Sequence, residues 1–204
     1  MALSHAKLIG KLAIVWGVLS SMLAIAAPTW DRNQPIQLDA QSSDFDYKSG
    51  TLAFQSVHIV QGGFSIEADH ANATGLDFKD SEWRFSGHVS ILTPDGSLSS
   101  TAAKLTFRDN AVSTAHIDGT PAAFEQKQAS RVAKGHAEHI DYDFNTGQIS
   151  LNGDAWLTDG ANEISGHTLV YDLREQHIRA NQEEQNSQRI HITINPRKPD
   201  KATP

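Results

Sequence analysis

The chain has 204 residues, of which 39% are hydrophobic and 20% are charged, a composition typical of a folded protein rather than a disordered one. It contains no cysteine, which excludes disulfides, thiolate metal sites and a cysteine nucleophile. The formal net charge is −7, and this acidity argues against a protein that binds nucleic acid by neutralising phosphates.

The first 26 residues are predicted to be a cleaved signal peptide. Lys7 and Lys11 precede an apolar run over residues 12–27, which is shorter than the roughly 20 residues that a membrane span needs. Ala24 and Ala26 place small residues at the −3 and −1 positions of a cleavage site. Without the two lysines, 15 basic residues face 24 acidic ones, a net charge of −9. We therefore expect an exported protein, and a retained N-terminal anchor is the alternative.

From Gln34 onward, apolar and polar residues alternate over short stretches separated by Gly, Asn, Asp and Ser, which predicts β-strands with one buried face. The aromatic residues fall on the apolar phase, so we expect them to share one inner face with nearby aliphatic residues. The expected inner face consists of Ile36, Leu38, Phe45, Tyr47, Phe54, Ile59, Phe78, Phe85, Phe107, Phe124, Tyr142, Phe144, Leu151, Leu169 and Tyr171.

The chain also repeats itself. Residues 44–54 match residues 141–151 at a displacement of 97, with acidic, aromatic and glycine positions in register, including Gly50 and Gly147. Such self-similarity is the signature of a repeat architecture.

A third copy lies between these two. Residues 76–89 match residues 142–155 at a displacement of 66 and align Gly87 with Gly153. A period near 32 or 33 residues fits both displacements, and each unit reads as a hairpin-like set of short strands that cannot bury its apolar face alone. The sequence therefore predicts an elongated stack of antiparallel strands, with a compact sandwich as the alternative.

Catalytic and metal-binding patterns are weak. His136 and His139 have the most suggestive spacing, but a regular strand would direct them to opposite faces, so we expect neither a metal site nor a cofactor. The acidic pairs Asp44/Asp46 and Asp141/Asp143 belong to the repeat and are interpreted as a solvated outer face rather than as glycosidase carboxylates. The sequence therefore does not indicate an enzyme.

The inner face allows two interpretations. It either collapses into a dry core, as in a structural or adhesive repeat protein, or it forms a trough that is open along one edge. A trough would hold acyl chains, because each buried methylene contributes about 0.8 kcal/mol. The acidic charge disfavours attraction of phosphate, so an amphiphile would be held by its tails.

Several short motifs decide between these interpretations by resemblance. They are residues 34–36 (QPI), 119–126 (GTPAAFEQ), 135–142 (GHAEHIDY), 151–157 (LNGDAWL) and 162–166 (NEISG), followed by Tyr171. Together they resemble the OstA-like (LptA) family of periplasmic lipopolysaccharide transport proteins, from about Gln34 to Asn195. The resemblance implies a twisted, partly open β-jellyroll over residues 27–195. Residues 196–204, which contain proline and lysine, are expected from their composition to form a mobile tail.

The resemblance also implies a function, a location and partners. Proteins of this family shield the acyl chains of lipid A and join head to tail into a bridge through the periplasm. LptC is expected at the N-terminal edge and LptD at the C-terminal edge, and no nucleic acid is expected. An inner-membrane-anchored relative of the LptC type remains the alternative.

Individual residues follow from the resemblance together with the alternation. Ile36, Phe124, Tyr142 and Phe144 match lipid-contacting positions of the family, and Leu38, Phe54, Leu151 and Leu169 share their apolar phase. One additional repeat is expected between residues 69 and 118, so the resemblance assigns no residue there. The strands Gln34–Gln41 and Gln188–Asn195 are expected to be assembly edges that pair with neighbouring molecules; their apolar residues are Ile36, Leu38, Ile190, Ile192 and Ile194.

Overall fold

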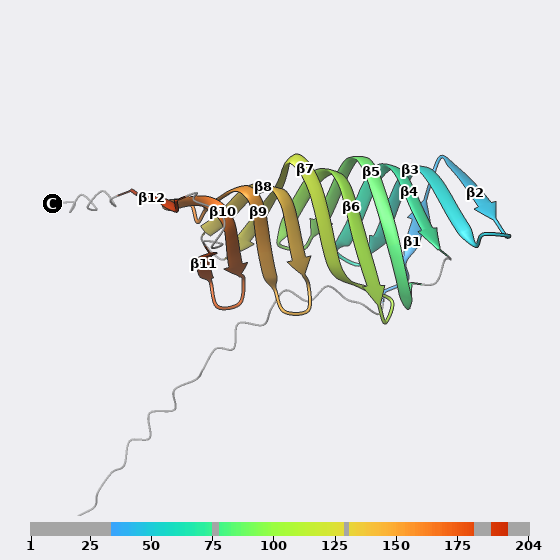
Figure 1. The fold of residues 1–204 in the computed structure, drawn as a ribbon. Helices are drawn as coiled ribbons and strands as arrows, with labels where there is room; N and C mark the ends of the chain where they lie inside the picture. Colours follow the sequence, from blue (N-terminus) through green and yellow to red (C-terminus); the bar gives the residue numbers. More distant parts are fainter. Residues whose placement is uncertain (1–33, 75–77, 129–130, 182–188, 196–204) are drawn as a thin grey trace, which may run out of the picture.

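The computed structural model describes residues 34–74, 78–128, 131–181 and 189–195. These residues form a single antiparallel sheet in the order β1-β3-β4-β5-β6-β7-β8-β9-β10-β11, with β2 added to β3 and β12 added to β10 (Figure 1). The strands are β1 (Gln37–Asp39), β2 (Ser42–Asp46), β3 (Thr51–Gln61), β4 (Phe64–Thr74), β5 (Asp80–Thr93), β6 (Gly96–Arg108), β7 (Ala111–Gln128), β8 (Arg131–Asp143), β9 (Gln148–Thr158), β10 (Asn162–Asp172), β11 (His177–Asn181) and β12 (His191–Ile194).

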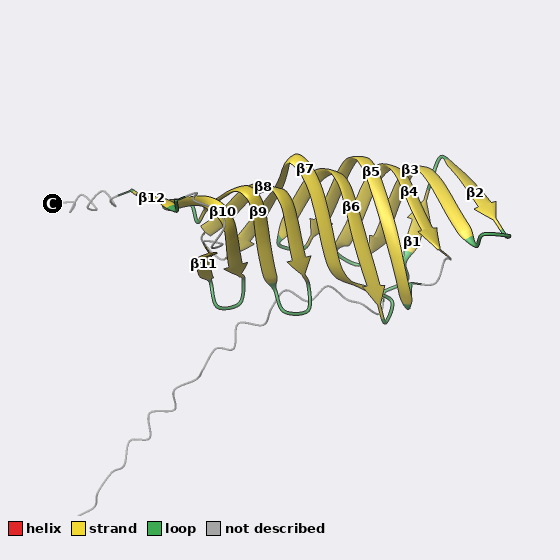
Figure 2. Cartoon of the chain, viewed as in Figure 1, coloured by secondary structure: helices red, strands yellow, loops and turns green. Residues whose placement is uncertain are grey.

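The elements confirm the all-β prediction, since the described residues are strands joined by turns (Figure 2). No described helix is long and apolar enough to cross a membrane. The predicted signal peptide (residues 1–26) and tail (residues 196–204) lie outside the described residues.

The prediction of short strands is wrong, because the central strands run for 11 to 18 residues. These strands bend near their middle. Register shifts occur there in all six consecutive strand pairings from β4–β5 to β9–β10. Such β-bulges insert an extra residue and turn the strand without ending the pairing. The bulges follow one another across the sheet and form a bend line, so the sheet folds onto itself into an elongated jellyroll (Figure 1).

Two glycines on the bend line confirm the sequence repeat. Gly87 and Gly153, which the repeat aligns, have φ of +74° and +76°, and each is followed by a residue that also has a positive φ. A Cβ atom at either glycine would collide with a carboxylate side chain of the preceding strand, Asp69 or Glu138. Glycine is therefore required for both the backbone conformation and the close approach of the neighbouring strand.

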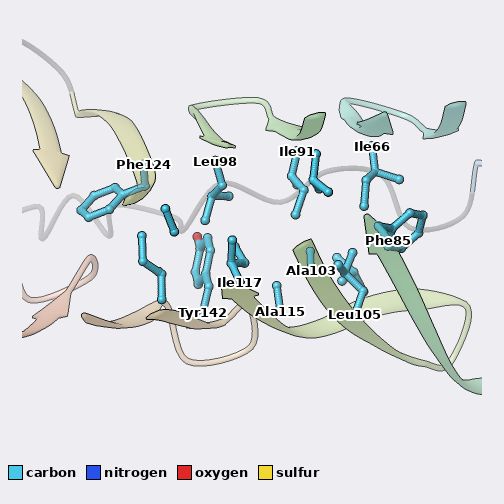
Figure 3. Close-up of a cluster of buried hydrophobic side chains, with 14 of the residues drawn as sticks. Ile66, Phe85, Ile91, Leu98, Ala103, Leu105, Ala115, Ile117, Phe124 and Tyr142 are labelled. Atoms are coloured by element: carbon cyan, nitrogen blue, oxygen red, sulfur yellow. The ribbon is translucent and has the colours of Figure 1, made fainter. Parts of the chain in front are cut away.

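The bend line divides the inner face into two walls. Wall I carries buried residues that include Phe54, Trp83, Leu105, Ile117, Tyr142, Leu151 and Leu169, and wall II carries Ile59, Ile66, Ile91, Leu98, Phe124 and Leu157. In Figure 3, Ile66, Ile91 and Leu98 point towards the side that carries Leu105, Ile117 and Tyr142, and the Phe124 ring lies on the same side as the first three. The two walls therefore pack directly on each other as one apolar cluster.

The turns at the ends of the strands repeat as well. Asp46 Oδ1 accepts hydrogen bonds from the backbone N–H groups of Lys48 and Ser49 at 2.8 and 3.4 Å. Asp143 Oδ1 accepts equivalent bonds, at 2.8 and 3.1 Å, from the residues two and three positions later. These Asx-turns explain why the sequence repeat contains an aspartate followed by a glycine four residues later.

Turn hydrogen bonds predict a loss of stability in acid. The backbone N–H of Lys48 and the Ser49 side chain hold the pKa of Asp46 below its usual value of 3.8, and the backbone N–H of Glu175 does the same for the pKa of Asp172. A pKa lowered by folding contributes stability above 3.8 that disappears as pH falls through the folded-state pKa. We expect the free energy of unfolding to decrease below about pH 4. Urea unfolding between pH 7 and pH 3 measures this, and Asp172→Asn should flatten the dependence; an unchanged slope would contradict the assignment.

Candidate lipid-binding interior

Six of the eight predicted lipid-contacting residues lie fully on the inner face. The buried residues are Phe54, Phe124, Tyr142, Phe144, Leu151 and Leu169, each less than 9% exposed. Phe124 belongs to wall II and the other five belong to wall I. The alternation therefore identifies the inner face correctly, and the contact of these residues with lipid remains a prediction.

The other two, Ile36 and Leu38, lie at the N-terminal edge. Leu38 is in β1 and pairs with Ile59 of β3, and Ile36 precedes this strand. Both side chains are half-buried and pack on the edge of the apolar cluster. The expected edge strand over residues 34–41 is therefore shorter, spanning three residues, and β2 lies beside it as a second edge strand.

Two aromatic residues of β2 and its turn do not belong to the buried face. Tyr47 is 94% exposed, so its predicted place in the interior is wrong. It follows the last residue of β2 and lies in the turn, where the alternation no longer applies. Phe45 is 38% exposed and packs edge-on against Phe54, with ring centroids 6.0 Å apart. Phe45 therefore continues the inner face to the end of the sheet without being covered.

An aromatic cluster surrounds Trp83, a residue that the sequence analysis did not assign, although its ring partners were predicted on the inner face. Trp83 is completely buried and stacks on Phe54 at 5.7 Å, on Phe78 at 4.9 Å and on Phe85 at 6.2 Å between ring centroids. The alternation around Trp83 and Phe85 signalled this face. Trp83 itself was not assigned because it lies in the predicted additional repeat, where the resemblance assigned no residue.

Two buried polar atoms in this cluster lack hydrogen-bond partners. They are Nε1 of Trp83 and Oγ of Ser81, which is two residues earlier in β5 and also faces inward. Burying such a group without a partner costs about 1–3 kcal/mol. Wall I therefore contains one N–H group and one O–H group that are buried without a partner.

Opposite the bend line, the strand ends and turns of the two walls meet along a seam, the unpaired edge, where no described strand pairs across from one wall to the other. It is bridged by a side chain, since Gln61 Nε2 at the end of β3 in wall II donates to the carbonyl of Asn110 in a turn of wall I at 2.9 Å. Phe64 and Phe144 also meet across this edge, with ring centroids 6.3 Å apart and planes at 88°. The two walls are thus joined here by side-chain contacts, which are weaker than a continuous hydrogen-bonded ladder.

Tyr142 shows how apolar the space between the walls is. Burial, reinforced by the nearby Asp95 carboxylate, raises the pKa of the Tyr142 phenol to about 12. Asp95 belongs to the β5–β6 turn at the end of wall II, whereas Tyr142 lies in wall I. The phenol therefore stays neutral at physiological pH, and the interior carries no charge at this position.

Both ends of the sheet expose apolar side chains. At the C-terminal end, Ile190, Ile192 and Ile194 are 41%, 58% and 73% exposed. Ile192 pairs with Ile164 of β10, which packs on the apolar cluster, so the inner face continues onto β12 without a covering wall. The predicted strand over residues 188–195 is limited to β12, because Ile190 precedes it and residue 188 lies outside the described residues.

His136 and His139 both lie on the outer face of the sheet, contrary to the prediction. A register shift between them places both side chains on the outer face, where His136 stacks on Trp156 at 5.1 Å between ring centroids and His139 Nδ1 lies 2.6 Å from Asp118. The predicted opposite orientation is therefore wrong, because the bulge adds one residue between the two histidines. The repeated acids Asp46 and Asp143 serve the turns, as described above.

Comparisons with known proteins agree with this architecture. The chain is 26% identical to the lipopolysaccharide export system protein LptA of Escherichia coli K12 over 176 residues, covering 83% of this chain and 79% of that protein. It is 24% identical to LptH of Pseudomonas aeruginosa over 179 residues, 85% of each chain. Relatives of these two kinds favour neither an LptC-type protein nor a repeat protein without a lipid ligand.

A solved structure confirms the fold. The crystal structure of LptH, described as the LptA-homologous periplasmic component of the lipopolysaccharide transport device of Pseudomonas aeruginosa, superposes with a TM-score of 0.53 at 23% identity and covers 82% of this chain and all of that chain. The family profile described as LptA/(LptD N-terminal domain) LPS transport protein matches residues 37–177, from β1 to the start of β11. The chain therefore belongs to the LptA/LptD N-terminal domain family of lipopolysaccharide transport proteins.

Proposed function

We propose that this protein binds lipopolysaccharide in the periplasm, shields the acyl chains of lipid A between walls I and II, and carries the molecule from the inner towards the outer membrane. The observation that carries this proposal is the apolar face itself. In the described part of the chain, it runs without interruption through the sheet, is bordered by one edge without strand pairing, and has exposed apolar side chains at both ends. The names and functions of the relatives support the same conclusion.

The binding mode follows from the weak closure of the unpaired edge. Acyl chains entering between the walls replace apolar wall-to-wall contacts with equivalent apolar contacts, and each methylene removed from water contributes about 0.8 kcal/mol. The opening breaks the Gln61–Asn110 hydrogen bond. The phosphorylated head group stays outside at this edge, because the net charge of −9 without the signal peptide gives the protein no general attraction for phosphate.

Site-specific photo-crosslinking in living cells tests this binding mode. A photoreactive amino acid at Phe124, which is buried on the inner face of wall II, is expected to capture lipopolysaccharide. The same amino acid at Ala123, the next residue on the outer face, is expected to capture none, because neighbouring strand residues point to opposite sides. The readout is a lipopolysaccharide-specific immunoblot of the purified adducts.

A second inner position guards against local distortion. Tyr142 lies in the opposite wall, and capture from both Phe124 and Tyr142 places the acyl chains between the walls. Asp143 is a poor outer control because its carboxylate holds a turn. Equal capture from Ala123 and Phe124 would overturn the proposal.

We further propose that the ends of the sheet join neighbouring molecules. Each end offers one short strand to each wall: β2 to wall I and β1 to wall II at the N-terminal end, and β11 to wall I and β12 to wall II at the C-terminal end. Pairing of such ends by β-augmentation would make the apolar interior continuous from one molecule to the next. The N-terminal end then receives lipid from LptC, the C-terminal end delivers it to LptD, and copies of this chain bridge the distance.

A further inference from the structure

The tripeptide His-Ile-Asp occurs twice, on two neighbouring strands. One copy, residues 116–118, lies on β7, and the other, residues 139–141, lies on β8. The antiparallel register sets His116 opposite Asp141 and His139 opposite Asp118. The two isoleucines are fully buried, so all four polar side chains project from the outer face of the sheet. We call these four residues the His–Asp quartet.

Three side chains of the quartet converge on one point. The Oδ1 atom of Asp118 lies 2.6 Å from His139 Nδ1 and 3.3 Å from His116 Nε2. One ligand atom from each of these residues falls within 4.8 Å of the others, and the two imidazole rings are nearly parallel at 9°. The side chains are 41–52% exposed, so a dissolved ion can reach them.

The fourth side chain orients one of the ligands. His116 Nδ1 lies 2.6 Å from Asp141 Oδ1. Because an ionised carboxylate only accepts hydrogen bonds, the facing ring nitrogen carries the proton and donates it. In the neutral ring, His116 then presents the lone pair of Nε2 towards Asp118. The same carboxylate–histidine arrangement supports metal-bound histidines in many proteins.

We propose that His116 Nε2, His139 Nδ1 and the Asp118 carboxylate bind a divalent transition-metal ion, best matched by Zn²⁺, with Asp141 as a positioning residue. Two imidazole nitrogens and one carboxylate oxygen form a ligand set typical of zinc, whereas calcium and magnesium prefer oxygen ligands alone. The ion takes the place of the proton between His139 Nδ1 and Asp118, and the ring proton of His139 then lies on its other nitrogen, Nε2.

The surroundings of the quartet are compatible with a cation. A shallow hollow of about 380 Å³ adjoins it, lined by residues that include His116, Asp141 and Lys104, and leaves space for water to complete the coordination. Lys104 is the one cation next to the quartet in that lining, and its ammonium lies 3.8 Å from the Glu82 carboxylate. The two quartet carboxylates therefore dominate the local charge.

A bound ion would act on the bend line. Asp118 borders the register shift between β7 and β8, and His139 borders the shift between β8 and β9. A metal bound by these residues would link β7 and β8 at the bend line, where each strand passes between wall I and wall II. This role is independent of lipid binding, and it predicts that Zn²⁺ raises the melting temperature by mass action.

Zinc titration of tag-free protein tests the site. Competition against a chromophoric chelator is expected to give one Zn²⁺ per chain, with much weaker binding in His116→Ala and His139→Ala. Asp141→Asn is expected to keep the stoichiometry and weaken the affinity about 10- to 100-fold, as for other outer-shell partners of metal-bound histidines. Far-UV circular dichroism verifies that each variant is folded, which is expected because the side chains are on the surface.

The matched control is His88→Ala. His88 forms a single pair with Asp69 at 2.7 Å on the same bend line, so the variant removes a His–Asp pair without touching the quartet and should bind Zn²⁺ as the wild type does. Wild-type binding no tighter than that of His116→Ala would overturn the proposal, as would an equal loss in His88→Ala. Absorption bands of the Co²⁺-loaded protein give a second readout, and they should disappear in His139→Ala.

Discussion

Trp83→Ala is expected to destabilise the protein by about 3–5 kcal/mol, the usual cost of truncating a buried tryptophan to alanine. Trp83 is completely buried and stacks on three aromatic rings, so the truncation leaves a cavity in wall I and removes the surface on which Phe54, Phe78 and Phe85 pack. The free energy of unfolding of an ordinary domain is about 5–15 kcal/mol, so this variant would lose a large part of its stability. Urea unfolding followed by far-UV circular dichroism measures the loss.

Two controls separate the roles of the ring and of its N–H group. Trp83→Phe retains an aromatic ring and removes the unpartnered Nε1, so it should cost far less than Trp83→Ala. Trp156→Ala removes the tryptophan that stacks on His136 on the outer face and should cost less than about 1 kcal/mol. Equal losses in Trp83→Ala and Trp156→Ala would show that the Trp83 cluster does not support the fold.

Alternation was sufficient to predict the inner face within regular strands. Phe54, Phe124, Tyr142 and Leu151 are buried as predicted, because residues two apart in a strand share a face. The same rule failed at Tyr47, since the strand ends one residue earlier and the turn redirects the side chain. The period of the repeat was also informative, because Gly87 and Gly153 occupy equivalent bends.

The bend line could not be predicted from alternation alone. A bulge shifts the phase by one residue, so the alternating pattern on either side of it reads as two short strands instead of one long bent strand. The same shift placed His136 and His139 on one face, against expectation. The His–Asp quartet was overlooked for a related reason, because its two halves lie far apart in the sequence and meet only through the register of β7 with β8.

The contacts that close the unpaired edge depend on tertiary structure. Gln61 and Asn110 are polar residues next to turns, and nothing in their local sequence indicates that one bonds to the other. Phe64 and Phe144 also meet only when the sheet folds at the bend line. These contacts hold the walls together, and the proposed entry of acyl chains requires the walls to separate here.

The backbone of β12 is arranged to accept a further strand. Asn162 accepts a hydrogen bond from the backbone N–H of Asp159, so its backbone groups face β9. The side to which the backbone N–H and C=O groups point alternates from one residue to the next along a strand. The backbone groups of Ile164, two residues after Asn162, therefore also point towards β9. Its partner on the other side, Ile192, consequently directs its N–H away from β10, towards the side of β12 on which no described strand pairs.

Ile192→Pro is therefore expected to weaken end-to-end association while leaving the protein folded. Proline removes the outward N–H of Ile192, which would leave a carbonyl of the incoming strand without a partner at a cost of about 1–3 kcal/mol. That cost corresponds to a roughly 5- to 150-fold weaker association constant. Light scattering over a dilution series measures the association, and urea unfolding measures the stability of the fold.

Ile192→Thr separates the backbone contribution from that of the side chain. Threonine keeps the N–H group and its β-branched shape suits a strand, so this variant loses only apolar contact and should associate more strongly than Ile192→Pro. If Ile192→Pro forms oligomers of the same size as the wild type at every dilution, the proposed role of β12 as an assembly edge is contradicted. A proline variant that fails to associate and also unfolds at lower urea would instead show that β12 stabilises its own sheet, which contradicts the outward direction of the Ile192 N–H.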